Sequence, residues 1–368
     1  MKKIIITTIL LSAVIISTFF LHEKMNGAES PAIAPNPSKK YKMVVYWAGL
    51  GEYEWAKRLE KASHKLGWEC INCYSGDNMT DFEKQFVDKP TQSIEETIKQ
   101  HKPDFIISLK EDKIFTKAVP NYLCITGVFK QYFFPNPWDS KKVLDFAGVL
   151  YASQNANNLK AFVEGCGKVF YGMSWYPSCA STDYIQVVPK KLFYCGFQWD
   201  GKRNGEEYHK MFSLLDQCGY LNVYGPKESW QCAPNSTKGL LPFDGESISR
   251  AIREAGVTLV SHAQTHMELE TPTSRIFEAA SSCSVIISDK HPFIMREFGD
   301  SVLYIDGDKN GDDLFKQIDS HMKWILLHPK EAEIMARKAH TIFTEKFTLE
   351  KQLQNLAELH EKIMSQKA

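Results

Sequence analysis

Short apolar runs alternate with longer amphipathic stretches in the first half of the chain. Residues 49–67 predict a glycine turn followed by a helix that ends at Gly67, and residues 93–101 predict a second helix. Continuous apolar runs predict strands at 43–49, 68–74, 104–109, 122–127, 146–153 and 168–174. Apolar strands that alternate with helices are typical of a parallel sheet covered by helices on both faces.

The alternation begins again after a predicted interdomain linker at residues 177–191. Strands are predicted at 192–196, 220–225, 257–262, 284–288 and 302–306, with helices at 205–218, 247–256 and 275–281 between them. The run from 329 to 367 is helical and charged, with no further strand. The second half therefore predicts another Rossmann-like unit.

With 368 residues, the chain exceeds what one hydrophobic core usually fills. We predict an α/β protein with two doubly wound lobes, at residues 41–188 and 189–345, followed by a C-terminal helix at 346–368. Two such lobes leave a cleft between the carboxyl ends of their strands. Ligands of doubly wound sheets bind at these ends.

The N-terminus has a different pattern. Lys2 and Lys3 precede an 18-residue apolar or hydroxyl-bearing run at residues 4–21, which is long enough to span a bilayer. Residues 1–22 therefore predict a signal peptide or a signal anchor, and residues 23–40 a linker. Because small-x-small cleavage motifs are poor here, the sequence favours a membrane anchor. A cleaved segment would mean export instead.

Composition narrows the range of partners. Lys and Arg total 44, and Asp and Glu also total 44, so net charge gives no reason to expect a nucleic-acid partner. The nine cysteines do not make a closed disulfide framework, and we predict that most are buried thiols. In an exported chain some of them could pair.

The stretch ETPTSRIFEAASSC, residues 270–283, places two glutamates around a predicted helix start. Thr271 or Thr273 can cap this helix. Pro272 suits the first turn, where a missing N–H group is tolerated. The start of this helix is expected to point into the cleft.

Three polar residues of this helix share one face. Ser274 and Glu278 are four residues apart, and Arg275 is three residues before Glu278. The free N–H groups and the dipole of a helix N-terminus favour phosphate. Ser274 and Arg275 add a hydroxyl and a permanent cation, while Glu278 could accept hydrogen bonds from sugar hydroxyls. Glu270, in the preceding loop, would address a neighbouring group.

The two glutamates resemble the Glu-x7-Glu element of GT-B glycosyltransferases. More narrowly, the second lobe resembles the CgeB/YkvP spore-maturation-type family within the group 1 glycosyltransferases. The resemblance covers about residues 190–345. It rests on TPTSRIFEAASSCSVIISD, LFYCGFQWDGKR, NVYGP, LPFDGESISRAIREAGVTLVSH and PFIMREFGDSVLYIDGD. In the first lobe only the architecture fits.

The resemblance implies roles for the residues of this element. Glu278 would hold the ribose of a nucleotide-sugar donor. Ser274 and the helix start, with Thr273, would meet the diphosphate, and Arg275 would assist. Glu270 would face the donor sugar.

Further candidates surround the element. Arg203, after the turn at Gly196, is a candidate second cation for the diphosphate. His266 is close enough in sequence to the Glu270 loop to enter the site as a catalytic residue. One departure stands out, because the family's Ala-Cys-Gly is Ser-Cys-Ser at 282–284, and Ser284 must end the helix less easily than glycine.

Gly49 and Gly51 follow the first predicted strand without a complete GxGxxG motif. They predict either a tight strand-to-helix turn or a loop that lines the acceptor side of the cleft. Residues 306–317 lack the glutamate that ends a calcium loop, so an acidic turn that caps the next helix is the better interpretation. His262 and His266 have no evident third partner, and we predict no metal site.

The sequence therefore favours a metal-independent glycosyltransferase of the hexosyltransferase class. Its donor would be a UDP- or GDP-linked sugar, its acceptor a glycan, lipid or protein, and it would need no cofactor. One alternative is a periplasmic-type, two-lobed solute-binding protein, which an export signal favours. The other is a degenerate transferase homologue that binds a nucleotide without turnover.

Overall fold

The computed structural model describes residues 39–367, apart from gaps at 75–79, 88–92, 110–113, 115, 128–139, 155 and 198–199. The predicted signal or anchor segment at residues 1–22 lies outside the described residues, as does the predicted linker up to residue 38. Within the described ranges, no helix combines the length and the apolar character needed to cross a membrane.

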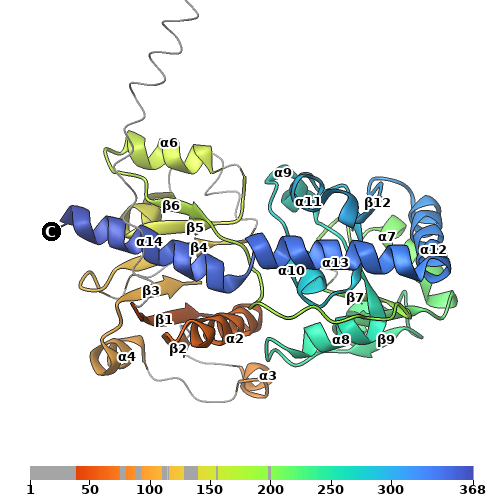
Figure 1. Cartoon of the computed structure of the whole chain (residues 1–368), viewed down its shortest axis with the longest axis horizontal. Helices are drawn as coiled ribbons and strands as arrows, with labels where there is room; N and C mark the ends of the chain where they lie inside the picture. Colours follow the sequence, from red (N-terminus) through yellow and green to blue (C-terminus); the bar gives the residue numbers. More distant parts are fainter. Residues whose placement is uncertain are drawn as a thin grey trace, which may run out of the picture.

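The first lobe is built on a sheet of six parallel strands in the order β2-β1-β3-β4-β5-β6 (Figure 1). Its strands are β1 (Lys42–Trp47), β2 (Glu69–Tyr74), β3 (Phe105–Ser108), β4 (Asn121–Ile125), β5 (Gly148–Tyr151) and β6 (Gly172–Ser174). Its helices are α2 (Leu50–Lys65), α3 (Asp81–Lys84), α4 (Ile94–His101), the 3-10 helix η1 (Ser140–Asp145) and α6 (Asn157–Gly165). All of β3 and β4 is buried, as expected for parallel strands that helices cover on both faces.

The second lobe repeats this plan with six parallel strands in the order β12-β11-β10-β7-β8-β9. Its strands are β7 (Lys191–Cys195), β8 (Leu221–Tyr224), β9 (Thr237–Gly239), β10 (Gly256–Val260), β11 (Val285–Asp289) and β12 (Leu303–Ile305). Its helices are α7 (Glu206–Gln217), η2 (Lys227–Trp230), α8 (Ser247–Ala255), α9 (Gln264–Glu268), α10 (Ser274–Ser281), α11 (Pro292–Phe298), η3 (Gly299–Ser301), α12 (Gly311–Leu327) and α13 (Pro329–Lys346).

The predicted α/β class with two doubly wound lobes is confirmed, and every strand predicted from the sequence overlaps an observed strand. The sequence did not predict β9, because its three residues, of which only Gly239 is buried, carry no apolar pattern. The loop before α12 has the expected capping role, since the side chain of Asn310 accepts a hydrogen bond from the backbone N–H of Asp313 at 2.9 Å.

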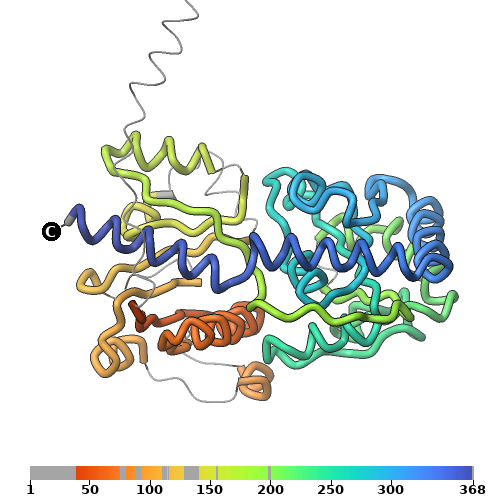
Figure 2. The backbone as a smooth tube through the Cα atoms, viewed as in Figure 1, coloured from red at the N-terminus to blue at the C-terminus, as the bar shows by residue number. Residues whose placement is uncertain are grey.

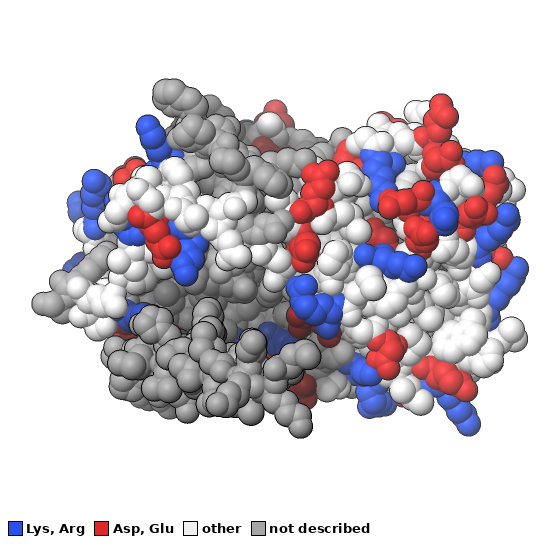
Figure 3. Space-filling view, turned by 90° about the horizontal axis from the view of Figure 1, so that it is seen from above, with Lys and Arg blue, Asp and Glu red and all other residues white. Residues whose placement is uncertain are grey.

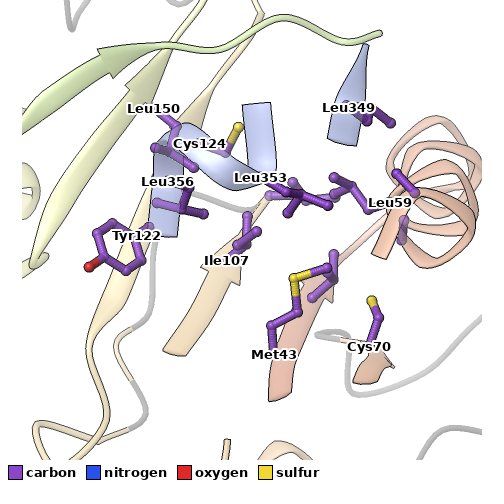
Figure 4. Packing of buried hydrophobic residues seen from close by; sticks show 14 of the residues in the cluster. Met43, Leu59, Cys70, Ile107, Tyr122, Cys124, Leu150, Leu349, Leu353 and Leu356 are labelled. Carbon is purple, nitrogen blue, oxygen red and sulfur yellow. The ribbon is translucent and has the colours of Figure 1, made fainter. Parts of the chain in front are cut away.

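Helices α13 and α14 (Leu349–Lys367) cross the molecule from the second lobe to the first (Figure 2). The side chain of Tyr122 in β4 hydrogen-bonds Nδ1 of His360 at 2.9 Å, and Tyr41 donates to Glu361 at 2.7 Å. Figure 4 shows three leucines of α14 in one hydrophobic cluster with side chains of the first lobe. The leucines are Leu349, Leu353 and Leu356, and the first-lobe side chains include Met43, Leu59 and Ile107. The C-terminal helix therefore belongs to the core of the first lobe and ties the two lobes together.

The linker between the lobes passes close to the end of α8. Gly256 ends this helix in the left-handed conformation, at φ 83°. A Cβ atom at this position would lie 2.6 Å from the carbonyl oxygen of Val188 in the linker. Glycine is thus required both by the backbone conformation and by the space.

Neither the charged side chains nor the cysteines form a distinctive feature on the parts of the surface described next. Figure 3 shows acidic and basic side chains intermixed over the second lobe on the face seen from above. All nine cysteines are unpaired, and Cys166 and Cys218 are the exposed ones.

Candidate active site

Helix α10 begins at Ser274, one residue before the predicted 275–281, so Pro272 lies before the helix and not in its first turn as expected. Thr273 is the residue before the helix, but its side chain makes no capping bond, and its Oγ1 is buried without a partner among the described residues. The side chain of Thr273 therefore accepts no hydrogen bond from the free N–H groups of the first turn. At the other end Cys283, rather than Ser284, adopts the left-handed conformation, at φ 61°.

A pocket of about 310 Å³ lies in front of this helix start, at the carboxyl ends of β7 and β10. Six residues singled out from the sequence line it together: Gly196, Arg203, His266, Thr273, Ser274 and Arg275. The remaining lining residues are Thr126, Gly127, Pro177, Tyr194, Cys195, Phe197, Leu259, Ser261 and Pro272. Because Thr126 and Gly127 follow β4 of the first lobe, the pocket lies between the lobes.

Arg203 is held in the pocket by Asp200. Its Nε donates to the Asp200 carboxylate, and its backbone N–H donates to the same carboxylate at 3.0 Å. Burial opposes the charge, but Tyr194 and Asp200 outweigh it and raise the pKa of Arg203. The guanidinium therefore stays charged inside a largely buried site.

Arg275 is the second cation of the pocket. Its Nη1 donates to Oε2 of Glu278, and its Nη2 donates to the carbonyl oxygen of Cys195 at 3.2 Å. These contacts direct the guanidinium towards the loop after β7, where Arg203 also lies. Two permanent cations thus line the pocket at the start of α10.

Glu278 does not line this pocket, and only 2% of it is exposed. Its Oε1 accepts from Nη2 of Arg58 at 2.6 Å, and its Oε2 accepts from Arg275. Burial would raise the pKa of Glu278, but the two arginines, with a hydrogen bond from Ser274, hold it below its ordinary value of 4.5. The carboxylate is therefore the centre of a buried ion network.

Arg58 reaches this network from α2 of the first lobe, and sequence reasoning missed it. It also pairs with Glu54 at 2.8 Å, and its side chain is 5% exposed. The signal was present, since Trp55, Leu59 and Ala62 define the buried face of α2 and Arg58 lies among them. An arginine on a buried helix face needs an acidic partner.

Glu270 lies in the loop between α9 and α10 and does not line the pocket. Its backbone is left-handed, at φ 48°, a strained conformation for a residue with a side chain. Its carboxylate is 3.6 Å from Arg296, and 37% of the side chain is exposed. The structure thus separates Glu270 from Glu278, and its predicted role towards the donor sugar stays a prediction.

The loop that carries Glu270 is clamped by the first lobe. The neighbouring Leu269 is fully buried in a hydrophobic cluster with Leu123, Ile125 and Leu159 of that lobe. Its carbonyl oxygen accepts a hydrogen bond from the hydroxyl of Ser153 at 2.7 Å. The positions of Glu270 and of the pocket therefore depend on both lobes.

A buried histidine–aspartate pair, His262 and Asp289, contacts the segment between α9 and α10. Nδ1 of His262 lies 2.6 Å from Asp289, and the backbone N–H of Thr273 donates to Nε2 of His262 at 3.4 Å. This bond assigns the proton to Nδ1, so Asp289 fixes the orientation of the ring. Asp289 is the last residue of β11 and His262 follows the adjacent strand β10, and that pattern could have revealed the pair.

His266 lines the pocket in its neutral form. Burial, together with His262 and Arg203, lowers the pKa of His266 to about 3. Its Nδ1 is buried and has no partner within the described part of the chain. A neutral ring can exchange hydrogen bonds with a sugar hydroxyl, whereas its low pKa makes it a weak base.

Gly49 and Gly51 lie at the start of α2, after the carboxyl end of β1. Gly49 is the residue before the helix, and its N–H donates to Glu52 at 2.9 Å. A Cβ atom at either glycine would meet nothing within 4 Å. The structure thus shows a strand-to-helix turn with open space beside it, and the acceptor-side role stays a prediction.

Over the described residues, no group of three or more His, Cys, Asp or Glu side chains has the arrangement of metal ligands.

Known protein families match part of the chain by sequence, whereas solved structures match both lobes by fold. Residues 209–358 match a family described as glycosyl transferase-like. No curated protein sequence matches the chain. The family match therefore covers most of the second lobe and about the first half of α14.

Solved structures extend the similarity to both lobes. A glycosyltransferase from Rickettsia africae shares 13% identity, with 89% of this chain and 99% of that chain covered and a TM-score of 0.53. An alpha-glucosyltransferase in complex with UDP and a 13-mer DNA shares 11% identity, with 88% and 100% covered and a TM-score of 0.58. MnaA of S. aureus with UDP shares 12% identity, with 88% and 97% covered and a TM-score of 0.52.

The fold is GT-B. At these identities the likeness shows the fold alone, while the glycosyl transferase-like match in the second lobe is independent of it. Within GT-B, the narrower CgeB/YkvP-type assignment stays a prediction. The pocket described above lies in the cleft between the two GT-B lobes.

Proposed function

We propose that this chain is a glycosyltransferase that moves a sugar from a nucleoside diphosphate sugar to an acceptor hydroxyl. One observation carries the proposal: Arg203 and Arg275 line one interlobe pocket together with the uncapped start of α10. Guanidinium groups and helix N-termini are the groups that bind diphosphates in proteins. The glycosyl transferase-like sequence of residues 209–358 supports the same activity.

The reaction is a substitution at the anomeric carbon of the donor. The acceptor oxygen forms a bond to this carbon, and the bond from the carbon to the diphosphate oxygen breaks. The electron pair stays on the diphosphate, and the acceptor proton passes to water or to the leaving phosphate. Arg203, Arg275 and the first turn of α10 stabilise the negative charge that develops, so we propose that transfer needs no metal ion.

Glu278 acts in this proposal as a positioning residue. Both of its oxygens are engaged by arginines, and it is buried behind Arg275. It therefore fixes the cation that meets the diphosphate. This differs from the direct contact with ribose that the sequence resemblance implies.

The proposal also names the donor nucleotide, the place where the acceptor enters and the role of the N-terminal segment. UDP and GDP are the proposed nucleotides. The structures with bound UDP are of other proteins with the same fold, and they make UDP the first choice. We propose that the acceptor enters beside Gly49 and Gly51, and that the apolar segment at residues 1–22 attaches the enzyme to a membrane.

A panel of nucleotides and small solutes tests the proposal. We expect UDP or GDP to stabilise the purified chain against thermal unfolding, by about 2.7 kcal/mol at 100 times the dissociation constant. ADP serves as the related nucleotide, with free hexoses and amino acids as small solutes. Stabilisation by a free sugar or amino acid, with none by any nucleotide, would contradict the proposal and favour a solute-binding protein. Release of the nucleoside diphosphate from a matching nucleotide sugar then separates an active transferase from a degenerate one.

A further inference from the structure

A second cavity, of about 90 Å³, lies at the junction of the lobes and shares no lining residue with the donor pocket. Helix α2 of the first lobe faces α8 of the second lobe here, beside the linker (Figure 1). Its lining comprises Arg58, Lys61, Cys179, Ala180, Thr182, Gly245, Glu246, Ser249, Arg250, Arg253 and Ser281. The cavity therefore has walls from both lobes and from the segment that connects them.

The lining is strongly basic. It holds four cationic side chains and one carboxylate, and Lys61 pairs with that carboxylate, Glu246, at 2.6 Å. Among the described residues, no acidic side chain lies within ion-pair distance of Arg250 or Arg253. Arg250 is exposed and Arg253 is half-buried, so solvent screens part of their mutual repulsion, and an anion between them would reduce it further.

Arg58 adds an unsatisfied donor. Only 4% of this residue is exposed, and its Nη2 forms ion pairs with the carboxylates of Glu54 and Glu278. Its Nε is buried and has no hydrogen-bond partner in the described structure. Such donors are rare in folded proteins, and this one leaves Arg58 with hydrogen-bonding capacity that its two carboxylate partners do not use.

We propose that this cavity binds a phosphate group. The space exceeds the roughly 30 Å³ that one water occupies and suits a tetrahedral oxyanion. Guanidinium groups match the oxygens of phosphate in geometry as well as in charge. Because Arg58 belongs to one lobe and Arg250 and Arg253 to the other, the bound group would link the lobes beside the segment that connects them.

The source of the phosphate is either the free ion or a phosphomonoester. Titration of the full chain with inorganic phosphate and with glycerol 3-phosphate, at constant ionic strength, distinguishes the two. Tighter binding of the monoester would identify a phosphorylated metabolite as the ligand. Equal or tighter binding of inorganic phosphate would identify the free ion, and either result supports the site.

Substitutions locate the binding. We expect Arg250→Gln and Arg253→Gln each to weaken phosphate binding about 10- to 100-fold, because each removes a charged donor. Neither residue has an ion pair in the described structure, so both variants should fold. Arg203→Gln, in the donor pocket, and Lys316→Gln, on the exposed face of α12, should keep wild-type affinity at this site.

Two results would overturn the proposal. One is the absence of saturable phosphate binding by the wild-type chain at millimolar concentrations. The other is unchanged binding in both Arg250→Gln and Arg253→Gln. A response to UDP that persists in these two variants, with phosphate binding lost, would show that this site is independent of the proposed transferase activity.

Discussion

Replacing Glu278 with glutamine should lower the free energy of unfolding by about 3–5 kcal/mol, which is typical of removing one partner from a buried ion pair. The carboxylate is 2% exposed and lies between Arg58 and Arg275. Its loss leaves two buried guanidinium groups with one fewer counter-charge. Urea or thermal unfolding of the wild type and Glu278→Gln measures the difference.

Acidification should reduce this difference. The pKa of Glu278 is lowered in the folded state, so its contribution is complete above its ordinary value of 4.5. It is lost as the pH falls through the lower, folded-state value. The two proteins should therefore approach each other in stability only under strongly acidic conditions.

Two controls separate the ion network from general damage. Glu268→Gln, at an exposed position on α9, should change stability by less than about 0.5 kcal/mol. A double-mutant cycle with Arg58→Gln should give a coupling energy of about 0.5–3 kcal/mol. Additive effects of the two substitutions would mean that Arg58 and Glu278 do not interact across the lobes.

Replacing Arg203 with glutamine should lower the rate of sugar transfer by about 10²- to 10³-fold, the typical effect of removing one donor that stabilises a developing anion. Arg203 lines the donor pocket and is not part of the Glu278 network, so the fold should survive. The measurement is the release of nucleoside diphosphate under saturating donor, with a thermal unfolding curve for each variant.

The choice of replacement tests the reason for the effect. Arg203→Lys keeps the charge but loses the forked geometry, so it should recover only part of the rate. Arg337→Gln, on the exposed side of α13, should leave the rate unchanged. A rate for Arg203→Gln within a factor of three of the wild type would remove Arg203 from the proposed machinery.

The alternation of apolar strands and helices was sufficient to predict both sheets. Parallel strands buried on both faces are almost continuously apolar, as in β3, β4 and β10, so their positions are visible in the sequence. Strand β9 and the short helix α9 have no comparable pattern. Strand β9 pairs with β8, and α9 lies in the connection between β10 and α10.

The donor pocket was predictable in part for a related reason. Gly196 follows β7, and Thr273 comes at the end of the loop that follows β10. Because β7 and β10 are neighbours in the sheet, their carboxyl ends bring these loops together. Local sequence thus identified six of the second-lobe residues that share the pocket.

The partners of Glu278 could not be predicted in the same way. Arg58 is 220 positions away in the sequence and belongs to the other lobe, so its contact with Glu278 depends on how the lobes dock. The burial of Leu269 in the first lobe depends on the same docking. Periodicity describes single elements and contains no information on such contacts.

A structure of the protein with a nucleoside diphosphate bound tests the central claim most directly. The account predicts that the diphosphate lies in the interlobe pocket, within hydrogen-bond distance of Arg203, Arg275 and the first turn of α10. The nucleotide would fill the space between the loops after β7 and β10. A nucleotide bound elsewhere on the protein, with this pocket empty, would contradict the account.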